Sequence, residues 1–334
     1  MPAKASSKKP AIPPPPVLDG ASTTVKKAFA NALKKKRYVD DYAKASRALG
    51  ALLAKDDAAR EQLHAIARSL AHALAALGKI ESLGPKTRAA GFERVDALEW
   101  IITSLRCAGP QNDAPLIALA AAVNDGPIRG RIANVLRGGQ IELPASSDPG
   151  LAALFDTSDD AVTLRCSFGV QWERDENGAR DAAKKILADG EDERRLVCVL
   201  DHLEHADKDH AAWTTLVAPL AISDSRTISI YASNHFTKQK AAFHAFVEWV
   251  KSLTAPAEQR RALAVLAPNV YWAYVANREI RDELVEPLRA LRERAVSMKD
   301  GSGVKALDAA AKKTGIDLGV AKPTKTKKRT RARA

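Results

Sequence analysis

The sequence has few cysteines, few aromatic residues and no long apolar run, and each shortage excludes a class of protein. Its three cysteines, Cys107, Cys166 and Cys198, are far apart and form no Cys-x-x-Cys pair, which argues against a disulfide framework or a zinc ribbon. Aromatic residues make up only 5% of the chain, so closely packed helices are favoured over a broad sheet. We therefore expect the three thiols to be reduced, and because reduced thiols are typical of intracellular proteins, we expect a cytoplasmic location.

No segment has the ~18 uninterrupted apolar residues of a transmembrane helix, so we expect no membrane insertion. The N-terminal residues MPAKASSKKPAIPPPP are basic, but no apolar run follows them. A signal peptide needs such a run, and none is therefore predicted here.

Positive charge is concentrated at the two ends of the chain. Residues 1–37 contain nine Lys or Arg and one acid, and residues 322–334 contain seven and none, so the net charge of +12 comes entirely from the ends and the body between them is slightly negative. Clustered cations attract phosphates without regard to base sequence. These basic arms therefore predict non-specific affinity for DNA or RNA through Lys34, Lys35, Lys36, Arg37, Lys325, Lys327, Lys328, Arg329, Arg331 and Arg333.

Apolar residues recur at helical spacing over most of the chain, which predicts a mainly α fold. Clusters of Pro and Gly and the basic ends mark the boundaries. The predicted order is a disordered Pro/Lys leader (1–22), a helical region (23–138), a loop or boundary (139–150), a second mainly helical region (151–315) and a disordered basic tail (316–334).

The first predicted helix, which begins near Thr23, is amphipathic and basic. Val25, Phe29 and Leu33 form one apolar stripe, and lysines cover the rest of the surface. Two interpretations are open. The helix could bind an anionic surface or a nucleic acid, or its stripe could pack on the body of the protein.

One segment breaks the helical rhythm. Apolar residues alternate with polar or small ones throughout residues 162–172, which indicates a β-strand. Two shorter apolar runs, 195–200 and 227–232, are compatible with buried strands or helices. The alternative fold is therefore a helical N-terminal half followed by a small α/β domain.

Four segments share an acidic or proline opening and an arginine before an Ala/Leu-rich helix: DDAAREQLHAIA, GPIRGRIANVL, EDERRLVCVL and PAEQRRALAVL. In this pattern the chain resembles the HEAT-like helical-repeat proteins, over about half of its length. The resemblance implies stacked helical hairpins, and such stacks expose long surfaces for a protein or nucleic-acid partner.

The densest group of metal-competent side chains lies in residues 198–210. On a helix, Cys198, His202, His205 and Asp209 fall in one stripe, and thiolate, imidazole and carboxylate are ligands for zinc or a related ion. The stripe is the basis of an alternative function, a metal-dependent enzyme. A solvated polar face that is rich in histidine is the simpler interpretation.

No other catalytic pattern is present: the sequence has no Gly-x-Ser-x-Gly, no His-Glu-x-x-His and no phosphate-binding loop. The aromatic run 270–274 could form a stacking platform for bases, although helical spacing favours core packing. The leading hypothesis is a non-enzymatic helical scaffold or binding module without a cofactor. A protein partner is expected, together with DNA or RNA at the basic arms.

Overall fold

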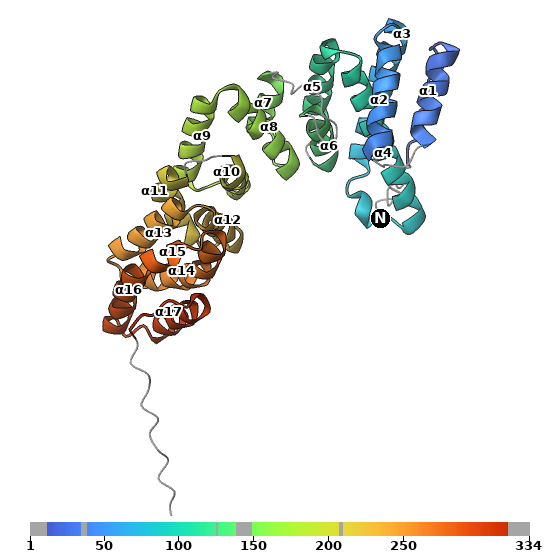
Figure 1. Ribbon diagram of the computed structural model, residues 1–334. Helices are drawn as coiled ribbons and strands as arrows, with labels where there is room; N and C mark the ends of the chain where they lie inside the picture. The colour runs from blue at the N-terminus through green and yellow to red at the C-terminus, as the bar shows by residue number, and fades with distance from the viewer. Residues whose placement is uncertain (1–11, 35–38, 125, 138–148, 207–209, 320–334) are drawn as a thin grey trace, which may run out of the picture. The chain divides into compact units, whose positions relative to one another are not determined.

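The protein is mainly α-helical, as its sequence predicts. The computed structural model describes residues 12–34, 39–124, 126–137, 149–206 and 210–319. Within these residues it contains seventeen α-helices, three short 3-10 helices and no β-strand (Figure 1).

The contacts divide the chain into two compact units, and the division falls between Lys185 and Ile186, inside helix α9 (Glu176–Asp189). The predicted boundary at 139–150 lies elsewhere, mostly outside the described residues. The helices on its two sides pack against each other, so the core is continuous across it. The helices of the first unit before α9 are α1 (Thr23–Lys34), α2 (Val39–Leu53), α3 (Asp57–Ala76), α4 (Pro85–Cys107), α5 (Asp113–Ala122), α6 (Pro127–Leu136), α7 (Pro149–Thr157) and α8 (Ala161–Arg174).

The first unit is built from pairs of consecutive helices. α1 packs on α2, α3 on α4, α5 on α6 and α7 on α8. The even-numbered helices also contact one another in sequence, from α2 through α4 and α6 to α8, and so form a continuous row (Figure 1). α3, α5 and α7 form a second, looser row. Fully buried aliphatic residues such as Leu63, Leu98 and Ile132 fill the space between the rows.

The second unit repeats this arrangement. One row runs from α10 through α12 and α14 to α17, and α11, α13 and α16 form the other. Phe236, Phe243 and Phe246 are fully buried between α12 and α13. The helices of this unit after α9 are α10 (Glu193–Ala206), α11 (Thr214–Ala221), α12 (Arg226–Thr237), α13 (Lys240–Ser252), α14 (Pro256–Ala276), α15 (Ile280–Glu283), α16 (Val285–Ser297) and α17 (Gly301–Thr314).

The strand predicted for residues 162–172 is wrong, because this segment forms α8. Its inward face does not follow the alternation: Val162 is exposed, whereas Thr163 and Ser167 are buried. The Ser167 hydroxyl can be buried because it donates a hydrogen bond of 2.7 Å to the carbonyl of Thr163. Residues 195–200 and 227–232 lie within α10 and α12, so the α/β alternative is wrong as well.

The predicted disordered leader is wrong for its second half. Residues 12–22 run without regular secondary structure against α3 and α4, and Leu18 is 4% exposed within the core. The backbone is held at two points, where Arg94 donates to the carbonyl of Pro13 at 3.0 Å and the N–H of Gly20 donates to Gln62 at 2.8 Å. At the other end, Ile316 and Leu318 are buried, so the predicted disordered tail is packed as far as Leu318. Residues 1–11 and 320–334 lie outside the described residues.

A buried glutamine in α14 provides a test of the second core. Gln259 has no exposed surface, and neither its amide oxygen nor its amide nitrogen has a hydrogen-bond partner in the described part of the chain. An unpaired buried amide lowers stability, and an apolar side chain of similar shape removes this penalty. We expect Gln259→Met to raise the free energy of unfolding by about 1–2 kcal/mol, measured by chemical denaturation. Gln171→Met, at a partly exposed position, is the control and should change it little. A loss of stability in Gln259→Met would contradict the interpretation.

Candidate functional site

An exposed pair of aromatic residues marks the outer face of α14. Trp272 is 58% exposed and Tyr271 is 37% exposed, whereas Leu266 and Val270 on the same helix are fully buried. The two exposed rings pack edge to face, with their centroids 5.3 Å apart and their planes at 69°. Tryptophan and tyrosine are enriched among the residues that contribute most to binding, so this pair marks a candidate binding surface.

Two grooves meet at Trp272. The first, of about 370 Å³, lies between α14 and α17. The second, of about 330 Å³, lies between α14 and α12 and reaches Glu204 of α10. The indole of Trp272 therefore lies between two grooves on the surface of the α10–α12–α14–α17 row. The first groove is lined by Ala267, Pro268, Tyr271, Trp272, Ala306, Ala309, Ala310 and Lys313, and the second by Glu204, Asn234, Thr237, Lys238, Asn269, Trp272, Val275 and Ala276.

The small residues of α17 shape the first groove. Ala306, Ala309 and Ala310 lie at helical spacing and carry no side chain beyond Cβ. The wall of the groove that α17 forms therefore has no bulky side chains. On α14, Pro268 lies one turn before Trp272 and has no N–H to donate to the carbonyl of Ala264. The next residue, Asn269, donates its side-chain amide to the carbonyl of Val265 at 2.9 Å, which supports the helix at this turn.

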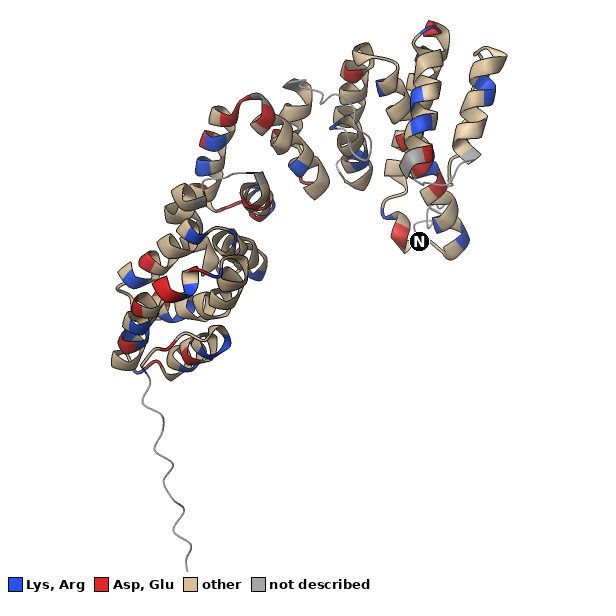
Figure 2. Ribbon diagram, viewed as in Figure 1, with Lys and Arg blue, Asp and Glu red and all other residues tan. Residues whose placement is uncertain are grey.

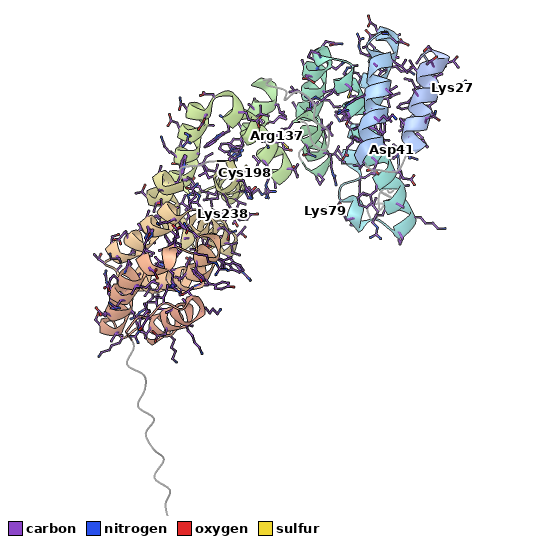
Figure 3. The ribbon with its side chains drawn as sticks, in the orientation of Figure 1. Lys27, Asp41, Lys79, Arg137, Cys198 and Lys238 are labelled. Atoms are coloured by element: carbon purple, nitrogen blue, oxygen red, sulfur yellow. The ribbon has the colours of Figure 1, made fainter. Side chains whose placement is uncertain are left out.

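Each groove contains one lysine. Lys313 lies in the first groove, which has no acidic lining residue. Lys238, labelled in Figure 3, follows α12 and lies in the second groove. Its ammonium is 3.2 Å from the carboxylate of Glu204. Elsewhere, basic and acidic residues are interspersed along the helices of each unit (Figure 2). The site thus combines an exposed indole with a cation on either side of it.

Three of the four predicted metal ligands, Cys198, His202 and His205, lie in the described residues, and they are not brought together there. Cys198, labelled in Figure 3, is buried at 3% exposure inside the core. His205 is exposed near the end of α10, and one of its ring nitrogens lies 2.8 Å from the carbonyl of Asp201. His202 is partly buried between them, and Asp209 lies outside the described residues. No three His, Cys, Asp or Glu side chains in the described ranges come close enough to share an ion. Because Asp209 lies outside the described residues, the metal-dependent enzyme is neither confirmed nor contradicted and stays a prediction.

The other two cysteines show no sign of activation. Burial raises the pKa of the Cys166 thiol to about 11, against the opposing effect of Arg137, and burial also raises the pKa of Cys107. A thiol is nucleophilic only as the thiolate. Both side chains are therefore protonated at neutral pH and act as small packing groups.

The predicted nucleic-acid-binding residues lie almost wholly outside the described part of the chain. Lys34 ends α1 and its side chain is not described, and residues 35–37 and 320–334 are not described at all. The apolar stripe of α1 is placed: Val25 and Phe29 are 2% and 4% exposed and belong to the core. Of the two interpretations of this helix, packing on the body is therefore confirmed.

The helical spacing of the run 270–274 favours core packing for all of its residues, and this prediction is wrong for Tyr271 and Trp272. The sequence contained a usable signal. The fully buried residues Leu263, Leu266 and Val270 are three to four positions apart, and extending their phase places Ala273 inside and Trp272 outside. The prediction of core packing relied on the aromatic character of the run and did not use this helical phase.

None of the helices in the described ranges combines the length and the apolar composition that would let it cross a membrane. No protein-family model, curated protein or solved structure matches the chain. The function is therefore inferred from the geometry of the chain itself.

Proposed function

We propose that the protein is a non-enzymatic helical scaffold or binding module of the HEAT-like type, with basic arms that give it non-specific affinity for nucleic acids. The observation that carries the proposal is the exposed Trp272 between two grooves on a row of stacked helices. Stacked helical pairs present extended surfaces, and partners bind along them. The cytoplasmic location and a protein partner belong to the same proposal and rest on the cysteine usage and the helical stacking.

Titration of the full chain with fluorescently labelled DNA tests the nucleic-acid part of the proposal. Ionic contacts release counterions, so the affinity should fall with salt, with a logarithmic slope of ~0.7 for each single-strand phosphate that is neutralised. A full-length variant with glutamine at Lys325, Lys327, Lys328, Arg329, Arg331 and Arg333 should bind about ten-fold more weakly at low salt and with a smaller slope.

The control variant keeps the charge of the tail. Replacing Lys325, Lys327 and Lys328 with arginine preserves three cations, so affinity and salt slope should stay close to those of the parent. Absence of binding by the parent at low salt would refute the proposal. Equal binding by the parent and the glutamine variant would show that the tail plays no part.

A further inference from the structure

The surroundings of Trp272 indicate the chemistry of its ligand. The indole offers a flat, accessible π-face. Lys313 lies in the first groove without an acid among the lining residues, whereas Lys238 in the second is paired with Glu204 and keeps half of its side chain exposed. A ligand that fills both grooves across Trp272 would therefore need a planar apolar group at its centre, negative charge beside Lys313 and a hydrogen-bond acceptor beside Lys238, whose ammonium has three N–H donors.

Further cations lie on α17 next to the first groove. Lys305 and Lys312 are exposed and belong to the same helical face as Ala309. Asp308 is engaged elsewhere, since Arg292 donates to its carboxylate at 2.6 Å. The excess of accessible positive charge on this side of α17 complements an anionic chain.

Polar side chains in the second groove suit the same ligand. Asn234, Thr237 and Asn269 lie beside Lys238, and amide and hydroxyl groups hydrogen-bond to base edges, sugars and phosphates. The Thr237 hydroxyl already donates to the carbonyl of Asn234 at 2.9 Å, so its oxygen can still accept a hydrogen bond.

We propose that the α12–α14–α17 face binds single-stranded nucleic acid, with one base stacked on Trp272 and the flanking phosphates bound by Lys238 and Lys313. The inference rests on the proposed nucleic-acid-binding function and adds to it a site, a strand preference and a non-ionic contact. Stacking on an aromatic ring tolerates any base, because every base has a π-face. A duplex keeps its bases stacked on one another and denies them to Trp272. An acidic peptide satisfies the lysines but leaves the indole without a planar partner at this point.

The test uses the full chain and a short fluorescein-labelled oligothymidylate, with anisotropy as the readout. Trp272→Ala should weaken binding of the single strand by about ten-fold and leave binding of a duplex of the same length unchanged. Trp272→Phe, which keeps an aromatic face, should recover part of the loss. Because Trp272 is exposed, neither variant should change the circular dichroism spectrum or the unfolding midpoint.

The lysines are tested with a control matched for charge. Lys238→Gln with Lys313→Gln should weaken single-strand binding and reduce its salt slope, by ~0.7 for each phosphate that is no longer neutralised. Lys184→Gln with Lys185→Gln removes the same charge from exposed positions on α9 and should have a smaller effect. Equal losses in the two double variants would overturn the assignment of the phosphates to these grooves.

Intrinsic fluorescence gives a second readout. The chain has five tryptophans, of which Trp100, Trp172 and Trp213 are buried and Trp249 is partly buried, so Trp272 is the most accessible to a quenching base. Oligothymidylate should quench the parent protein and quench Trp272→Phe much less.

The outcomes separate this inference from the proposed function. If the parent binds duplex and single strand equally and Trp272→Ala changes nothing, the inference fails while salt-sensitive binding through the arms stands. If poly-glutamate displaces the single strand and protects Trp272 from quenching by acrylamide as well as oligothymidylate does, the face binds acidic peptides, and the inference is overturned. If the parent binds no nucleic acid, both proposals fail.

Discussion

Replacing Arg129 with methionine is expected to lower the free energy of unfolding of the first unit by about 3–5 kcal/mol. Arg129 lies in α6, is 7% exposed and donates to carbonyls at the ends of two other helices. Val123 accepts from two of its nitrogens, at 2.7 and 3.2 Å. Ala121 and Thr157 accept at 3.3 and 3.2 Å.

The size of the effect follows from what methionine leaves behind. The last carbonyls of a helix have no partner within the helix, and Arg129 supplies one to α5 and to α7 at once. A hydrogen bond from a charged donor contributes ~1.5–3 kcal/mol, and the buried carbonyl of Val123 would lose both of its bonds to this side chain. Methionine fills a similar volume, so the loss reports on the hydrogen bonds more than on packing.

Two further variants make the result specific. Arg129→Lys keeps the charge but lacks the planar fork that reaches several carbonyls, so we expect an intermediate loss. Arg68→Met, at an exposed position on α3, should change stability by less than ~0.5 kcal/mol. Hydrogen exchange resolves the two units, and the loss of protection should fall on α5, α6 and α7. Full protection of these helices in Arg129→Met would contradict the capping role.

The same arrangement recurs in both units. Arg106 of α4 donates to the carbonyl of Val135 at 2.9 Å and to Asp113 at 3.2 Å, which joins α4 to α5 and α6. Arg294 of α16 donates to the carbonyl of Lys251 at 2.6 Å and also to that of Leu253, at the end of α13. Arginine side chains thus link α4 and α6 to neighbouring helices in the first unit and α16 to α13 in the second, in addition to the apolar contacts between the rows.

Sequence periodicity predicted the helices correctly wherever it reported a single buried face. α1 is an example, because Val25 and Phe29 are buried as their four-residue spacing indicates. Periodicity failed for α8, which is buried on nearly every side. There Gly169 packs so close to Arg137 that a Cβ atom would lie 2.4 Å from its guanidinium carbon. In the sequence of α8, small residues such as Gly169 alternate with large apolar ones. This alternation resembles that of a β-strand although the backbone is helical.

The leader and the site depend on contacts that the sequence does not reveal. Residues 12–22 have no helical or strand period, and they are held by side chains distant in sequence, such as Arg94 and Gln62. Trp272 could be placed on the surface from the phase of α14, but the grooves beside it are formed by α12 and α17, which only the folded chain brings to it.

Replacing Phe246 with alanine is expected to cost the second unit about 3–5 kcal/mol of folding free energy, the range for a fully buried phenylalanine. Phe246 lies in α13 and is 0% exposed. Its ring is stacked on Phe236 of α12, with the centroids 4.3 Å apart and the planes at 4°, and on Trp249, with the centroids 5.8 Å apart. Alanine removes both stacking contacts and leaves a cavity between the two helices.

This substitution also connects the core to the binding face. α12 carries Asn234 and Thr237, which line the second groove, and its inner side is held by the stack of Phe236 on Phe246. Loosening the stack should therefore increase hydrogen exchange in α12 and α13 and weaken oligothymidylate binding, although no residue of the binding face has changed. Phe92→Ala, at a phenylalanine that is 38% exposed on α4, is the control and should change stability by less than ~1 kcal/mol. If Phe246→Ala lost stability but bound oligothymidylate as tightly as the parent, α12 would not be needed for the site, and the ligand would be held by α14 and α17 alone.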